Sequence, residues 1–119
     1  MEPFDINAGR FYLRALHEQS FFDDSATLAA LTPPTSIHHA EEAESGWMED
    51  RLYSWAVCEQ TSPDLLALVT YRPDTGEVGA HAAGAPEKVW DQNRDLGPIT
   101  LGQAAEAGRA AVSSTFPSS

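Results

Sequence analysis

The pattern of hydrophobic and polar residues changes its period several times along the chain. Four short runs are dense in aromatic, branched or otherwise apolar residues, as is typical of β-strands. They occupy residues 11–16, 53–59, 65–71 and 77–83. Turn signals rich in Pro, Asp and Gly separate the last three runs. We therefore expect these three strands to form an antiparallel meander.

Three other segments are typical of helices and are expected at residues 26–31, 38–52 and 100–116. In the second of them, Ala40, Ala43 and Trp47 recur at helical spacing, with acidic residues on the opposite side. Thr100 and Gln103 match the capping box that begins a helix. The order is β-α-α-β-β-β-α, which predicts an α+β fold with about four strands and three helices. We expect one domain over residues 1–119, with residues 1–9 and 117–119 as loose ends.

The charge composition of the chain argues against binding to nucleic acids and to anionic membranes. The chain has 119 residues, with 18 acidic and 7 basic residues and a net charge of -11. Nucleic acids and anionic membrane surfaces require clustered cations, and this sequence has no such cluster. An acidic surface mainly gives solubility, although it could also dock a basic partner. No basic leader or long apolar stretch is present, so we expect a cytoplasmic protein.

Cys58 is the single cysteine, so no disulfide can form within the chain. It falls inside the apolar run at residues 53–59, where nothing nearby would lower the pKa of its thiol. We expect a buried and unreactive side chain. Trp90, in an otherwise polar loop, either marks an exposed contact site or lies folded under its own loop.

The element order, with these residues, resembles the N-terminal portion of the GNAT-type N-acetyltransferase superfamily. The likeness is carried by residues 12–16 of the opening strand, 40–47 of the second helix, and 53–57, 65–71 and 74–79 of the later strands. It spans about residues 11–116 and implies a GNAT-like, mainly antiparallel sheet.

The signature of that family is R/Q-x-x-G-x-G/A at the start of the helix after the fourth strand. There, free N–H groups of the helix hold the pyrophosphate of acetyl-CoA. Arg94 and Gly97 match the pattern, and Thr100 follows at the helix start. The resemblance implies that these three residues bind the coenzyme if the chain uses one. Pro98 lacks an N–H, and Ile99 places a branched side chain where the family has Gly or Ala.

His81 and Glu77, on the fourth strand, are the candidate catalytic residues. Histidine titrates near neutral pH and could act as a general base toward an amine, as the resemblance implies for this position. Alternatively, His81 packs against its neighbours or faces solvent. His38 and His39 begin a helix without a second ligand at the spacing of a zinc site, so we expect no metal centre.

Two functional hypotheses follow. In the first, the chain is a truncated GNAT-like domain without a coenzyme that acts as a binding, dimerising or accessory subunit. In the alternative, it is an N-acetyltransferase whose acetyl-CoA slot is completed by a second subunit. The family continues beyond this helix with a fifth strand, whereas this sequence ends at Ser119. The strand at residues 77–83 would then be an open edge, which predicts a homodimer or a heteromeric protein partner.

Overall fold

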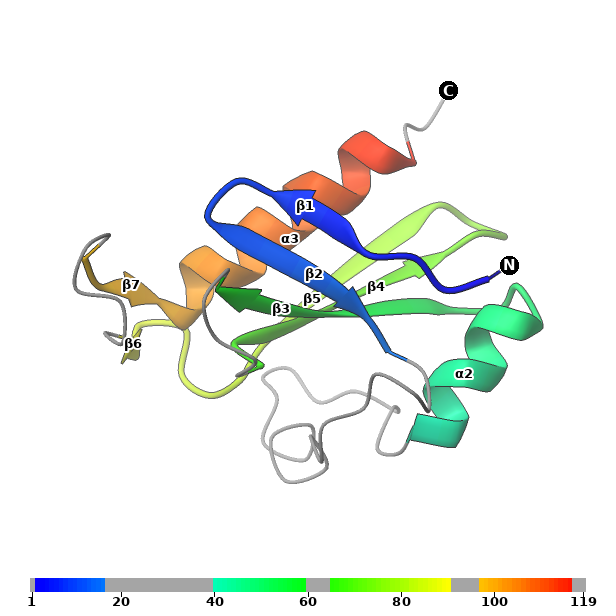
Figure 1. Ribbon diagram of the computed structural model, residues 1–119, viewed down its shortest axis with the longest axis horizontal. Helices are drawn as coiled ribbons and strands as arrows, with labels where there is room; N and C mark the ends of the chain where they lie inside the picture. The colour runs from blue at the N-terminus through cyan, green and yellow to red at the C-terminus, as the bar shows by residue number, and fades with distance from the viewer. Residues whose placement is uncertain (1, 17–39, 60–64, 91–96, 117–119) are drawn as a thin grey trace.

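The computed structural model describes residues 2–16, 40–59, 65–90 and 97–116 (Figure 1). Its centre is a five-stranded antiparallel sheet in the order β1-β2-β3-β4-β5. The strands are β1 (Ile6–Ala8), β2 (Phe11–Ala15), β3 (Tyr53–Glu59), β4 (Ala67–Arg72) and β5 (Glu77–Ala82). The remaining elements are α2 (Ala40–Met48), β6 (Val89–Trp90), β7 (Ile99–Thr100) and α3 (Leu101–Thr115). The predicted α+β class and antiparallel meander are confirmed.

The expected sheet of about four strands is one strand short of the central sheet, because the segment before residue 9 forms β1 instead of a loose end. β1 pairs with β2 across a turn in which Gly9 has a φ of 68°. α2 ends at Met48, four residues before the end of the helix predicted at residues 38–52. It ends because Asp50 adopts a φ of 53° and the N–H groups of Arg51 and Leu52 both donate to Gly46 O. The helix expected at residues 26–31 lies outside the described residues, which contain two helices.

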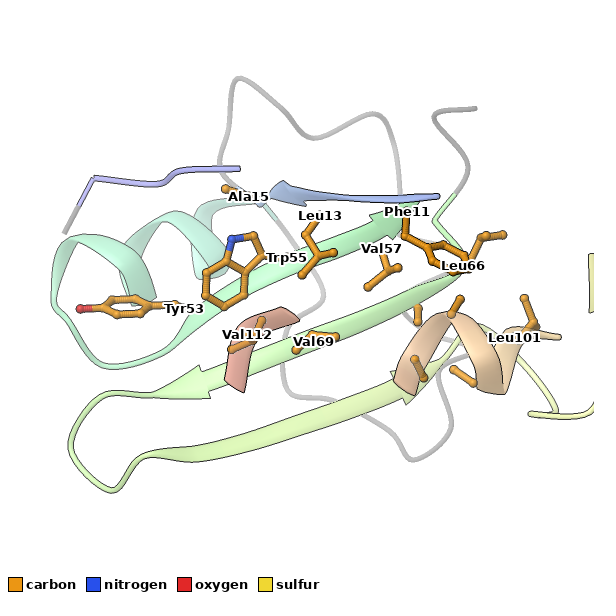
Figure 2. Packing of buried hydrophobic residues seen from close by; sticks show 14 of the residues in the cluster. Phe11, Leu13, Ala15, Tyr53, Trp55, Val57, Leu66, Val69, Leu101 and Val112 are labelled. Atoms are coloured by element: carbon orange, nitrogen blue, oxygen red, sulfur yellow. The ribbon is translucent and has the colours of Figure 1, made fainter. Parts of the chain in front are cut away.

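Helix α3 runs across one face of the sheet and covers the main core (Figure 1). Buried side chains of β2, β3 and β4 point toward Leu101 and Val112 of α3 (Figure 2). Gly108 marks the closest approach between helix and sheet. A Cβ at this position would lie 2.5 Å from Val69 Cγ2 and 2.6 Å from Val57 Cγ2. The absence of a side chain there is what lets α3 sit this close to β3 and β4.

An aromatic cluster fills one end of this core and includes residues from both ends of the described chain. Phe4 and Phe116 lie with ring centroids 6.0 Å apart, and both contact the fully buried Trp55. The Trp55 Nε1–H donates to Phe4 O at 2.8 Å. Tyr53 joins the cluster and donates its hydroxyl to Asp50 Oδ1 at 2.7 Å. Burial and this hydrogen bond raise the pKa of Tyr53 to about 12, so the hydroxyl remains protonated at neutral pH.

The opposite face of the sheet carries a smaller buried cluster beneath α2, made of Leu16, Ala43, Ala56, Cys58, Leu65 and Leu68. Cys58 is 3% exposed, and its thiol lies 3.8 Å from Ala56 O. The expected burial of this cysteine is confirmed. Neither of the helices in the described part of the chain has the length and apolar composition needed to cross a membrane.

Candidate functional site

The chain between β5 and α3 folds back over the N-terminal end of α3. This β6–β7 segment consists of residues 84–90 and 97–100, in which β6 pairs antiparallel with β7. Gly97 begins its second half with a φ of 81°, and its carbonyl accepts a hydrogen bond from the Arg10 guanidinium. The segment is therefore anchored to the turn between β1 and β2. Trp90 is half-buried and packs against the main core, so it is folded inward.

Every helix leaves its first four N–H groups without partners inside the helix. In α3 all four already have protein acceptors. The N–H of Thr100 donates to Gln103 Oε1 at 2.8 Å, and the N–H of Gln103 donates to Thr100 Oγ1 at 3.1 Å. This is the capping box that the sequence predicts. The other two N–H groups lie between these residues. The N–H of Leu101 donates to Lys88 O at 3.0 Å, and the N–H of Gly102 donates to Pro86 O at 2.8 Å.

The carbonyls of Pro86 and Lys88 thus stand where an anion would bind at this helix. Gly102 permits the contact, since a Cβ there would lie 3.0 Å from Pro86 O. The hydroxyl of Thr100 is likewise committed to the helix cap. Gly97 directs its carbonyl at Arg10, and Arg94 lies outside the described residues. The helix terminus is closed by the chain's own backbone.

The capping role of Thr100 can be tested separately from any ligand. Replacing Thr100 with alanine removes the acceptor for the Gln103 N–H and should lower the free energy of unfolding by about 1 kcal/mol. Thr115→Ala is the matched control near the other end of α3, where the hydroxyl bonds only to Ala111 O on the exposed surface. That control should change stability by less than about 0.5 kcal/mol. Urea titrations of both variants that gave equal losses would contradict the capping role.

The two candidate catalytic residues both lie on β5. Glu77 is exposed opposite Arg72, and His81 is half-buried opposite Leu68. They share one face of the strand, but they lie four positions apart, which is about 13 Å along a strand. Their side chains are on the face opposite α3, because Ala80 of the same strand packs toward the α3 side. The structure does not bring either residue to the α3 terminus.

An open groove of about 570 Å³ lies between β5 and the first turns of α3. Ala80 and Ala82 form one wall, and Gly102, Ala105 and Arg109 line the other. The sequence reasoning did not identify this groove. Its only signal is the run of small residues in the last strand of the meander, which suggests close approach by another chain segment.

Among the described residues, no group of three His, Cys, Asp or Glu side chains could hold a metal ion. His38 and His39 lie outside the described residues. Comparison of the chain with protein-family models, with curated proteins and with solved structures finds no match.

Proposed function

We propose that this chain is a GNAT-like domain that binds another protein chain and takes no acetyl-CoA, acting as a binding, dimerising or accessory subunit. The observation that carries the proposal is the closed N-terminus of α3. A pyrophosphate would need N–H groups that already donate to Pro86 O, Lys88 O and the capping box. The order of the described elements, from β2 through α2 and the meander to α3, supports the GNAT-like part of the proposal.

Opening this terminus for an anion is unfavourable for two reasons. Two backbone hydrogen bonds and the capping box would have to break, and each such bond stabilises a protein by about 1 kcal/mol. The preceding residue, Pro98, has no N–H to offer in exchange. The charge of the chain also disfavours coenzyme binding, because a chain with a net charge of -11 repels a polyanionic coenzyme.

The groove beside β5 favours the alternative function, since it lies next to the helix terminus where the resemblance places acetyl-CoA. In that case the chain is an N-acetyltransferase completed by a second subunit, with Arg94, Gly97 and Thr100 binding the coenzyme. His81 or Glu77 would take the proton of an amine as its nitrogen attacks the thioester carbonyl and the thiolate leaves.

A thermal-shift titration distinguishes the two functions. A coenzyme present about 100-fold above its dissociation constant stabilises the native state by about 2.7 kcal/mol, which raises the melting temperature by several degrees. We expect acetyl-CoA to leave the melting temperature unchanged. A saturable rise that disappears in Arg94→Ala would overturn the proposed function and establish the alternative.

A further inference from the structure

We draw no further inference here: the strongest candidate, the open groove between β5 and the first turns of α3, lies along a sheet edge that no strand of the described residues pairs with, and nothing in the structure shows what covers it.

Discussion

Replacing Gly108 with valine should lower the free energy of unfolding by about 3 kcal/mol or more, because the new side chain overpacks the core. Even its Cβ would lie 2.5 Å from Val69 Cγ2 and 2.6 Å from Val57 Cγ2, so α3 would have to move off the sheet. These are valine methyl groups from two adjacent strands, which leaves the helix no room to shift along the face. Urea denaturation followed by circular dichroism measures the loss.

Ala110→Val is the matched control for Gly108→Val, since it places the same β-branched residue two positions later on the exposed side of α3. It should change stability by only about 0.5 kcal/mol, the difference in helix propensity. Similar losses for the two variants would show that α3 does not pack closely on β3 and β4.

Replacing Trp55 with alanine should remove about 4 kcal/mol of stability. Its ring is fully buried, makes edge contacts with Phe4 and Trp47, and donates a hydrogen bond to Phe4 O. Domains are stable by only about 5–15 kcal/mol, so this variant should be unfolded or nearly so at 37 °C. Trp55→Phe retains most of the ring and loses the hydrogen bond, so it should cost about 1–2 kcal/mol.

Met48→Ala is the control for the Trp55 variants, because Met48 is 61% exposed and removing it creates no cavity. Its unfolding midpoint should match that of the unmodified chain. If Trp55→Ala also unfolded at the unmodified midpoint, the aromatic cluster would not be the stabilising end of the core.

The meander and α3 could be predicted because their signals are local. Turn residues separate β3, β4 and β5, and Thr100 with Gln103 begins α3 as the capping box predicts. β1, β6 and β7 could not be predicted, since three- or two-residue strands are too short to show an alternating pattern. The end of α2 was also missed, because it depends on a left-handed Asp50 and not on a glycine or proline.

The candidate site, like the fold, could be predicted from the sequence only in part. The sequence predicts Thr100 at the start of the helix. It could not show that the next two N–H groups of α3 donate to Lys88 O and Pro86 O. Those acceptors come from a segment more than ten residues away, so only the folded chain brings them to α3. The alternation of side chains along a strand predicts that His81 and Glu77 share one face. It does not predict which face of the sheet α3 covers, because that depends on packing across the whole sheet. The GNAT relationship remains a proposal, supported by the order of elements.

The pairing of Phe4 with Phe116 has a consequence for how the protein folds as it is synthesised. The aromatic cluster contains residues from both ends of the described chain. α3 covers the main core and is the last element of the described part of the chain. During translation the sheet can form first, but its apolar face stays open to water until α3 has left the ribosome. During that interval Trp55, Val57 and Val69 lack the cover that α3 gives them in the folded protein. The nascent chain is therefore most prone to aggregate after β5 has left the ribosome and before α3 has followed it.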